Sequence, residues 1–520
     1  MLFREILHST KGEDSVKLKE LLETNIANFG EYPFLFFKER TYTNLETRRY
    51  ANQFASGLGR MGIAKGDRVM ICLPNCPEVL FAYQGITRAG AIIVPVMFTL
   101  HPKELHYIAR NSGAKAVITS SYVLQNVEKS LETLPERPAV IVTDLPSNEN
   151  LTNFYDCMNQ VESDLVDDGN ADDTAVILYT SGTTGNPKGV LLTHKNLFSN
   201  AQNSAKHNDT ERGTTLGVLP LAHVYGLTVS NVCYLTGSAI VVFSSFDVKE
   251  VFKAIETYQV RTFSAVPAMI HSMVSFPNAD DYDTSSLESV GSGSAPLPVA
   301  LLNAFQQKFG AKVLEGYGLS EAAPVVTAHS KRIEVKPGSV GVPIPGVDIK
   351  IVDENGAEVP AGEVGELVVR GDNVTPGYYQ NQEETDRVLK DTWLFTGDMA
   401  RVDDEGYVYI VDRKKDLVIR GGFNVYPRDV EEILNGHQAV YEAAVVGVPD
   451  ERMGEELIAC VVKQPGNEVT EEELIRFCQD HLAKNKTPRR VIFLEALPRN
   501  GVGKILKTHL RKTASDIVIR

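Results

Sequence analysis

The segment YTSGTTGNPKG, residues 179–189, gathers three glycines, four serine and threonine hydroxyls and one lysine within eleven residues. Glycines allow backbone N–H groups to turn toward an anion because no Cβ blocks the approach, and Lys188 would supply the compensating positive charge. The apolar run AVIL at residues 175–178 predicts a buried strand that leads into this segment. The composition is that of a phosphate-binding loop, although a flexible surface turn uses the same residue types.

This segment differs from the usual nucleotide-binding P-loop, which requires GxxxxGK followed by Ser or Thr. Here Lys188 is followed by Gly189. We therefore expect a nucleoside triphosphate as the ligand, held in a different fold.

Three further short motifs carry groups that a nucleotide would need. GSGSAP, residues 291–296, follows an apolar strand and could press its backbone against a flat base. GYGLSE, residues 316–321, brings an aromatic ring, a hydroxyl and a carboxylate together on an expected loop. TGD, residues 396–398, offers a carboxylate on an expected tight turn, and a carboxylate can accept hydrogen bonds from both hydroxyls of a ribose. Each motif alone also fits a helix start or an ordinary turn.

Two basic segments follow. DRKKD, residues 412–416, reads as a polar junction, and PRNGVGKILK, residues 498–507, places Lys504 after a flexible Gly-Val-Gly. A lysine on such a segment could swing over a phosphate and neutralise charge as a transition state forms. A linker and a solvated surface lysine are the alternatives for each segment alone.

In this order, from about Tyr42 to Lys507, the motifs resemble the adenylate-forming (AMP-forming) superfamily of acyl-CoA synthetases, aryl-CoA ligases, luciferases and peptide-synthetase adenylation domains, and in particular bacterial fatty-acid-CoA ligases. The resemblance implies ATP, Mg²⁺ and coenzyme A as ligands. It implies contacts to these ligands, or a hinge between domains, at Thr180, Ser181, Gly182, Thr183, Thr184, Gly185, Lys188, Gly293, Ser294, Ala295, Pro296, Gly316, Tyr317, Gly318, Ser320, Asp398, Arg413, Lys415, Gly421 and Gly422.

The resemblance also assigns catalytic roles to Lys188, His223, Ser320, Glu321 and Lys504. Ser320 would contact the α-phosphate, Glu321 would hold Mg²⁺ against the phosphates, and Lys504 would approach the reacting groups. One carboxylate suits this metal, because Mg²⁺ usually takes one or two carboxylates together with phosphate oxygens and water.

Other positions would bind the nucleoside or move between half-reactions. By resemblance Tyr317 would stack on adenine, and Asp398 and Arg413 would bind the ribose. Lys415 would be the hinge, and the glycines at residues 421–422 would border the pantetheine path, where missing side chains admit a narrow ligand.

The implied chemistry activates a carboxylic acid. Attack of the carboxylate on the α-phosphate of ATP gives an acyl-adenylate and pyrophosphate, and a thiol then displaces AMP. Catalysis would rest on positioning and charge neutralisation, so the lack of a GxSxG nucleophile motif agrees with it.

The acid is indicated by LPLAHVYGLTVSN, residues 219–231, which matches the family's acyl-pocket motif with His223 near the carboxylate end. A lone histidine in an apolar run is also typical of a core residue. No acidic residue lies between positions 219 and 246, which disfavours an amino acid substrate. An apolar and roomy pocket is predicted from Gly217, Gly226, Gly237, Val224, Leu227 and Val229.

We therefore expect a medium- or long-chain fatty acid, with a cinnamate-type aryl acid as the second interpretation. The short turns between Glu321 and residue 406 show no inserted segment, which favours coenzyme A over a carrier protein as acceptor. A nucleotide-binding scaffold without turnover is the alternative outside enzymes.

Composition narrows the partners. The 520 residues include 52 basic and 67 acidic side chains, a net charge of −15, which argues against nucleic acid. Six scattered cysteines favour a reduced, cytoplasmic protein without structural zinc. Gln84 and Arg88 interrupt the longest apolar region, residues 79–100, so no transmembrane segment is expected. Peripheral membrane contact, a homodimer and the acyl chain length are left open.

The elements that must position these groups alternate between helix and strand. Helical periodicity at residues 46–61 and 75–89 alternates with short apolar runs such as AVIT and AIVVF, which predicts stacked α/β layers. From residue 347 short β runs indicate a small β subdomain. We expect a large N-terminal α/β domain over residues 1–413 and a small mobile α+β domain over residues 414–520, with the hinge near Lys415.

Overall fold

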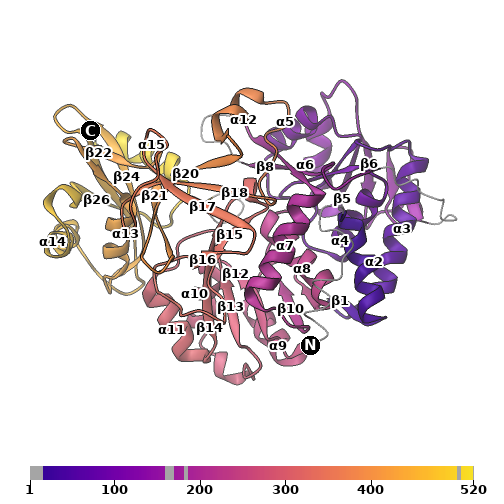
Figure 1. Cartoon of the computed structure of the whole chain (residues 1–520), viewed down its shortest axis with the longest axis horizontal. Coiled ribbons are helices and arrows are strands. Elements are labelled where there is room, and N and C mark those ends of the chain that lie inside the picture. Colours follow the sequence, from indigo (N-terminus) through magenta and orange to yellow (C-terminus); the bar gives the residue numbers. More distant parts are fainter. Residues whose placement is uncertain (1–15, 159–168, 181–185, 500–504, 519–520) are drawn as a thin grey trace.

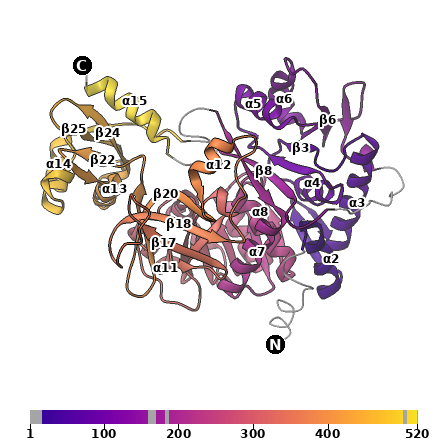
Figure 2. The same cartoon turned by 45° about the horizontal axis from the view of Figure 1, so that its top comes forward.

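The computed structural model describes residues 16–158, 169–180, 186–499 and 505–518. A large body of layered helices and sheets contains most of the chain, and a smaller lobe formed by the last hundred or so residues lies at one end (Figure 1). Figure 2 shows the same two parts after rotation, with helix α15 (Lys507–Val518) along the top of the small lobe. No helix within the described ranges is both long and apolar enough to cross a membrane.

A seven-stranded sheet forms the first layer, in the order β7-β6-β5-β3-β4-β8-β9. All neighbours are parallel except β8 and β9, which form an antiparallel hairpin. Successive residues of the strands pack on opposite faces: Val69 and Ile71 join one core cluster, and Met70 joins another. The strands are β3 (Arg68–Ile71), β4 (Ile92–Pro95), β5 (Ala116–Thr119), β6 (Ala139–Val142), β7 (Leu151–Asn153), β8 (Thr174–Thr180) and β9 (Lys188–Thr193).

Helices cover both faces of this sheet, so its strands are apolar on both sides. One face packs with buried residues of α2, α3 and α4, and the other with those of α5 and α6. The α3 helix begins after a capping box in which Thr43 accepts from the backbone N–H of Glu46. The bounds are α2 (Leu18–Phe29), α3 (Asn44–Arg60), α4 (Pro77–Arg88), α5 (Pro102–Ser112) and α6 (Ser121–Leu131).

Two further sheets complete the α/β part of the body. A four-stranded sheet has the order β10-β11-β1-β2, and a five-stranded sheet has the order β12-β13-β14-β15-β16. The strands are β1 (Pro33–Phe37), β2 (Arg40–Thr43), β10 (Thr214–Gly217), β11 (Ala239–Val242), β12 (Thr262–Ala265), β13 (Ser289–Ser292), β14 (Lys312–Gly318), β15 (Val325–Ala328) and β16 (Val342–Pro343). Their helices are α7 (His194–Asn208), α8 (Val224–Thr236), α9 (Val248–Tyr258), α10 (Pro267–Ser275) and α11 (Val299–Phe309).

The expected β subdomain is a five-stranded antiparallel sheet, and its core cluster also includes Val326 of β15 and Val340 and Ile344 near β16. It comprises β17 (Val347–Val352), β18 (Gly365–Gly371), β19 (Leu389–Lys390), β20 (Trp393–Val402) and β21 (Val408–Arg413), with α12 (Gln382–Val388) inserted before β19. Here one prediction is wrong: residues 396–398 do not form a tight turn after Trp393 but lie inside the ten-residue strand β20. Pairing with β18 on one side and β21 on the other keeps the strand continuous, and Gly397 absorbs a local irregularity at φ 73°.

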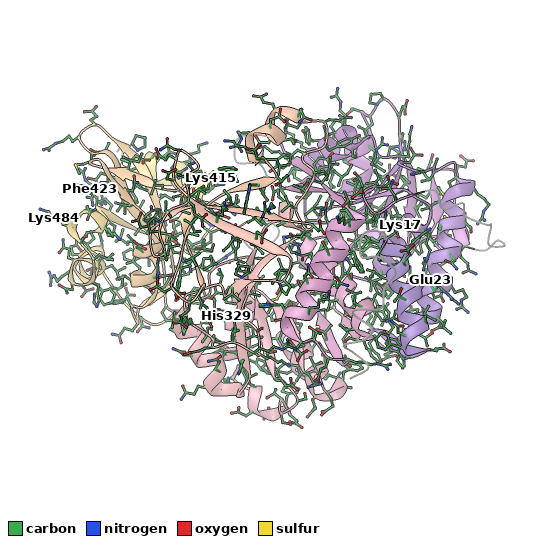
Figure 3. All side chains as sticks on the ribbon, viewed as in Figure 1. Lys17, Glu23, His329, Lys415, Phe423 and Lys484 are labelled. Atoms are coloured by element: carbon green, nitrogen blue, oxygen red, sulfur yellow. The ribbon has the colours of Figure 1, made fainter. Side chains whose placement is uncertain are left out.

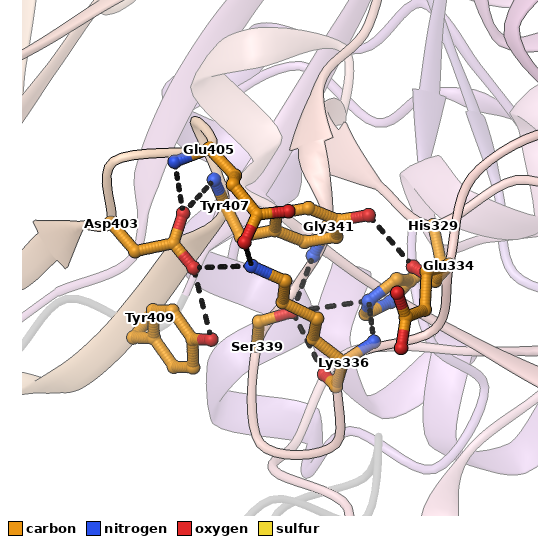
Figure 4. A network of polar contacts seen from close by, with 9 residues as sticks. All are labelled: His329, Glu334, Lys336, Ser339, Gly341, Asp403, Glu405, Tyr407 and Tyr409. Carbon is orange, nitrogen blue, oxygen red and sulfur yellow. Dashed lines mark hydrogen bonds and ion pairs between the residues drawn. The ribbon is translucent and has the colours of Figure 1, made fainter.

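The loop that follows β15 is fixed by a buried histidine (Figure 4). The Nδ1 of His329 faces the carbonyl of Glu315 at 3.0 Å, so this nitrogen carries the hydrogen. Its Nε2 then accepts from the Lys336 N–H at 3.2 Å and from the Ser339 hydroxyl at 3.0 Å. Burial lowers the pKa of His329, in keeping with a neutral ring. Lys336 also pairs with Asp403 at 2.9 Å, which joins this loop to the β subdomain.

The small lobe has a five-stranded sheet of its own and two separate core clusters. Its strands are β22 (Val418–Arg420), β23 (Phe423–Val425), β24 (Val440–Asp450), β25 (Gly454–Lys463) and β26 (Arg490–Phe493), and its helices are α13 (Pro427–Asn435), α14 (Glu471–His481) and α15 (Lys507–Val518). The mixed α/β class expected from the sequence is confirmed, with both the small β sheet and the α+β lobe in place.

Candidate functional site

A cavity of about 230 Å³ lies between helix α8 and the five-stranded sheet of β12 to β16. The α8 residues that line it recur at three- and four-residue spacings, as one helix face requires, and they are Val224, Tyr225, Thr228, Val229, Val232, Cys233 and Thr236. The opposite wall includes Phe263, Gly291 and Leu314 from three adjacent strands. The cavity therefore follows α8, whose thirteen residues span about 20 Å.

One end of this cavity collects several of the predicted residues. Its lining there includes His223, the turn residues Gly293 and Ser294, and the stretch Gly316 to Ser320. The parallel strands β13 and β14 end at this edge, so the motifs at their carboxyl ends come together even though they are separated along the chain. His223 caps the start of α8, where its Nδ1 accepts from the Tyr225 N–H at 3.3 Å. The cavity thus links the expected nucleotide motifs to the expected acyl motif.

The first three residues of the GYGLSE motif do not form the loop that we expected. Residues 316–318 are the last three of β14, which pairs there with β15. A Cβ at Gly318 would lie 2.2 Å from the carbonyl oxygen of Pro324, so this close approach of two backbones requires glycine. The pairing holds Tyr317 on a strand instead of a flexible segment, and only residues 320–322 form a 3-10 turn.

Tyr317, Asp398 and Arg413 meet although they are distant in sequence. The Tyr317 hydroxyl donates to Oδ2 of Asp398 at 2.5 Å. Asp398 and Arg413 are opposite each other in β20 and β21, and Nε of Arg413 lies 3.4 Å from Oδ1 of Asp398. Burial, and then the neighbouring Asp398 charge, raise the pKa of Tyr317 well above its usual value, so the phenol stays protonated as a donor. The structure brings together three residues to which the resemblance assigns the nucleoside.

Glu321 has a partner that the sequence did not indicate. The Tyr378 hydroxyl donates to its Oε1 at 2.8 Å, and the Thr375 N–H donates to its backbone carbonyl at 2.8 Å. Within the described residues no cluster of three or more His, Cys, Asp or Glu could hold a metal ion. A single carboxylate fits Mg²⁺ that is held mainly by phosphate oxygens and water. Glu321 would therefore serve as one such ligand, and Mg²⁺ would there neutralise phosphate charge.

Lys188 lies at the loop end of the β8–β9 hairpin, opposite Thr180. Its ammonium is 2.5 Å from Oε1 of Glu384 on α12 and 5.9 Å from the ring centre of Tyr378. Contacts with Arg387 and then Lys188 lower the pKa of Glu384 to about 2, against the effect of burial. Lys188 is thereby held beside the segment that also contacts Glu321. Ser181, Gly182, Thr183, Thr184 and Gly185 lie outside the described residues, as does Lys504.

Other predicted residues lie away from the cavity. Ala295 and Pro296 follow the two turn residues that line it, but are not part of its lining. Lys415 is in the turn between β21 and β22 (Figure 3). Gly421 and Gly422, with φ of 59° and 83°, form the two-residue turn between β22 and β23 on the small lobe. In this arrangement the glycine turn does not border the cavity, because Phe423 beside it lies at the far side of the lobe (Figure 3).

The prediction of which residues make the pocket roomy is only partly right. Val224 and Val229 line the cavity, whereas Leu227 and the three glycines do not. A Cβ at Gly226 would come within 2.2 Å of the Pro220 carbonyl oxygen, so this glycine serves helix packing. Tyr225 was not expected, yet its side chain is the nearest group to both glycines: its hydroxyl lies 3.3 Å from the Cβ position of Gly291, and its ring lies 3.3 Å from that of Gly293. The helical spacing of residues 225, 228, 229, 232, 233 and 236 was the signal that could have placed Tyr225 in the cavity lining.

Comparison with known proteins agrees with these motifs. A family model described as AMP-binding enzyme matches residues 22–379, and one described as AMP-binding enzyme C-terminal domain matches residues 429–504. A long-chain-fatty-acid–CoA ligase of Bacillus subtilis (strain 168) is 38% identical, with 96% of this chain and 95% of that protein aligned. A 4-coumarate–CoA ligase 1 of Solanum tuberosum is 34% identical, with 98% and 96% aligned. The crystal structure of ATP-bound MatB from Rhodopseudomonas palustris is 30% identical, covers 96% of this chain and 100% of that chain, and has a TM-score of 0.89.

Proposed function

We propose that this chain, which belongs to the AMP-binding enzyme family and is an AMP-forming acid–CoA ligase, takes a medium- or long-chain fatty acid as its substrate. The observation that carries the proposal is the cavity along α8. It begins at the Tyr317 and Ser320 end and continues between Val229, Val232 and Phe263. A cavity that follows α8 away from the predicted nucleotide site, with Val229, Val232 and Phe263 in its lining, suits an extended alkyl chain, whose methylenes each gain about 0.8 kcal/mol on burial.

The proposed reaction has two steps. The carboxylate oxygen attacks the α-phosphorus of ATP, the bond to the β-phosphate breaks, and pyrophosphate leaves. The thiol of coenzyme A then attacks the acyl carbon of the adenylate, AMP leaves, and the thiol proton passes to solvent. Neither step needs a nucleophilic side chain, so the protein contributes positions and charges.

The residues act through those charges. Asp398 and Arg413 would hold the ribose, with Tyr317 keeping the Asp398 carboxylate oriented. Ser320 would contact the α-phosphate. Lys188, held by Glu384, and Glu321, held by Tyr378, would both face the phosphates. Their opposite charges are useful together, because Glu321 would bind Mg²⁺ while Lys188 meets phosphate oxygens directly.

We further propose that the lobe beyond Lys415 moves between the two steps. The junction is short: Asp416 and Leu417 both donate their backbone N–H to the carbonyl of Arg413. The lobe beyond it has its own core clusters, so it can rotate as a unit. Lys504 would approach the carboxylate in the first step, and Gly421 and Gly422 would approach coenzyme A in the second.

A pyrophosphate-release assay with ATP and Mg²⁺ tests the substrate. Octanoate and hexadecanoate should support release, and adding coenzyme A should give the acyl-CoA and AMP. Release that requires an amino acid, or an acyl group found only on an added carrier protein, would refute the proposal. The Lys504→Ala variant should lose about 10²-fold or more in release while still converting premade acyl-adenylate to acyl-CoA. Equal loss in both steps would contradict that role.

An aryl acid is the second candidate substrate. It is favoured by the end of the cavity near Tyr317, where the Tyr225 side chain lies against Gly291 and Gly293 and offers an aromatic ring to a planar acid. The similarity to a 4-coumarate–CoA ligase over nearly the whole chain points the same way. Cinnamate and 4-coumarate therefore belong in the same assay, and a kcat/KM for them above that for all alkanoates would select this candidate.

A further inference from the structure

The end of the cavity farthest from Tyr317 carries charged residues, three of which line it: Glu211, Arg261 and Lys331. Arg261 immediately precedes β12, and Glu288 immediately precedes β13. These strands are parallel, with Thr262 opposite Ser289, so the two preceding side chains lie together at the edge of the sheet opposite the nucleotide motifs. The position of this charge cluster thus follows from strand register.

The four side chains form a continuous series of contacts, here called the distal ion-pair chain: Glu211, Arg261, Glu288 and Lys331. Nη1 of Arg261 lies 2.7 Å from Oε2 of Glu211, and its Nη2 lies 2.5 Å from Oε1 of Glu288. Lys331 contacts the other oxygen of Glu288. The backbone near Lys331 is fixed by the His329 network, which includes Lys336 and Ser339 (Figure 4). The distal ion-pair chain therefore joins four segments around the end of the cavity.

The lining changes in character along the cavity. Its middle is apolar, with Val229, Val232 and Phe263, whereas Thr262 and Ser289 beside the distal ion-pair chain are hydroxyls hydrogen-bonded to each other at 3.3 Å. An alkyl chain gains by burial in the middle and loses hydration of polar groups at the end. The acyl chain is therefore accepted up to a limit set by this end.

The barrier at this limit is weak. The side chains of Glu211 and Arg261 are 67% and 40% exposed, and exposed ion pairs are easily separated because water solvates both partners. Each further methylene that stays buried adds about a factor of four in affinity. A long acyl group can thus separate the ion pairs. The affinity of the enzyme therefore changes gradually with acyl length and has no sharp limit.

We propose that the distal ion-pair chain closes the acyl cavity and sets the preferred acyl length, with Arg261 as the central residue that a longer acid must displace. The inference rests on the proposed fatty acid substrate. Acids whose methyl end stops before Arg261 bind without disturbing the distal ion-pair chain. Longer acids separate Arg261 from Glu211 and pass toward solvent.

The test compares Arg261→Ala with Arg261→Lys across saturated acids from hexanoate to octadecanoate. In Arg261→Ala the ratio of kcat/KM for hexadecanoate to that for octanoate should rise by about 3- to 10-fold, the scale of one or two exposed ion pairs. Arg261→Lys keeps a cation and should stay near the wild-type ratio. Arg370→Ala is the matched control, because Arg370 pairs with Asp348 at 2.8 Å at a similar exposure on the β17–β18 surface.

An unchanged ratio in a variant that still uses octanoate would overturn the inference, and so would an equal change for every chain length. Failure of the proposed function is distinguishable, because the wild-type protein would then release no pyrophosphate with any alkanoate. In that case, binding of a fluorescent octadecapolyenoic acid to wild type and to Arg261→Ala tests whether Arg261 closes the cavity. Tighter binding to Arg261→Ala than to wild type would support a closed far end, and equal binding would reject it.

Discussion

The pair formed by Lys188 and Glu384 gives the sharpest test of how the phosphate side of the site is held. Replacing Glu384 by Gln keeps the shape of the side chain but removes its charge, leaving Lys188, whose side chain is only 22% exposed, without its carboxylate. Because an unpaired and partly buried cation is costly, we expect the Glu384→Gln variant to be less stable at pH 7. Its melting temperature and its KM for ATP are the quantities to measure.

The magnitude follows from the carboxyl pKa. Lowering it from 4.5 to about 2 corresponds to about 3 kcal/mol at neutral pH. Part of this comes from Arg387, which is 68% exposed and therefore contributes less than its contact suggests. We assign about 1 to 2 kcal/mol to the Lys188 pair. If Lys188 also contacts a phosphate of ATP, loss of its Glu384 partner should shift the ammonium group and raise the KM for ATP by about tenfold.

The sign of the pH dependence makes the test specific. The folded pKa is below the unfolded one, so the stabilisation is complete above about pH 4.5 and is lost as the pH falls toward 2. Melting temperatures of wild type and Glu384→Gln should therefore differ most at pH 7 and converge below pH 4.5. The control is Glu383→Gln on the exposed face of the same helix. A gap that stays constant across this range would refute the assignment of the effect to the charge of Glu384.

Three further changes test other parts of the site. Tyr317→Phe removes the donor to Asp398 and should raise the KM for ATP by about tenfold or more, so an unchanged KM would separate Asp398 from the nucleoside. Gly318→Ala would bring a Cβ to 2.2 Å from the Pro324 carbonyl and should cost about 1 to 3 kcal/mol in unfolding free energy, whereas unaltered denaturation would mean that the strand can shift. His329 has a lowered pKa, so wild-type stability should fall as the pH drops below about 6.5, and the melting temperature of His329→Gln should show a smaller fall over pH 7 to 5; equal slopes would place the titration elsewhere.

Local sequence patterns predicted the elements well because their cause is local. The AVIL run became the buried strand β8, and the expected helix at residues 46–61 lies within one or two positions of α3. Alternation and periodicity report burial on one or two faces, and that burial is what forms these elements. The turn expected at residues 396–398 is instead part of β20, because non-local pairing with β18 and β21 keeps the strand extended there.

The partners of the site residues could not be predicted in the same way. Glu384 is 196 positions from Lys188, and Tyr378 is 57 positions from Glu321. Neither partner lies in a glycine-rich or charged motif that marks a site. Only the fold, which stacks the β subdomain against the β8–β9 hairpin, brings them together.

The segment from Thr375 to Glu384 gives these separate contacts a common origin. Its backbone is bonded to β9, with Tyr379 N–H donating to the Gly189 carbonyl at 2.7 Å and Leu191 N–H donating to the Gly377 carbonyl at 3.0 Å. The same segment supplies Tyr378 to Glu321 and Glu384 to Lys188. A displacement of this segment would therefore move a predicted metal ligand and a predicted phosphate ligand together, so their separation is set by a stretch of chain outside every motif. Substitutions within the segment should consequently alter ATP and Mg²⁺ dependence in parallel, whereas substitutions in the motifs themselves should affect one ligand at a time.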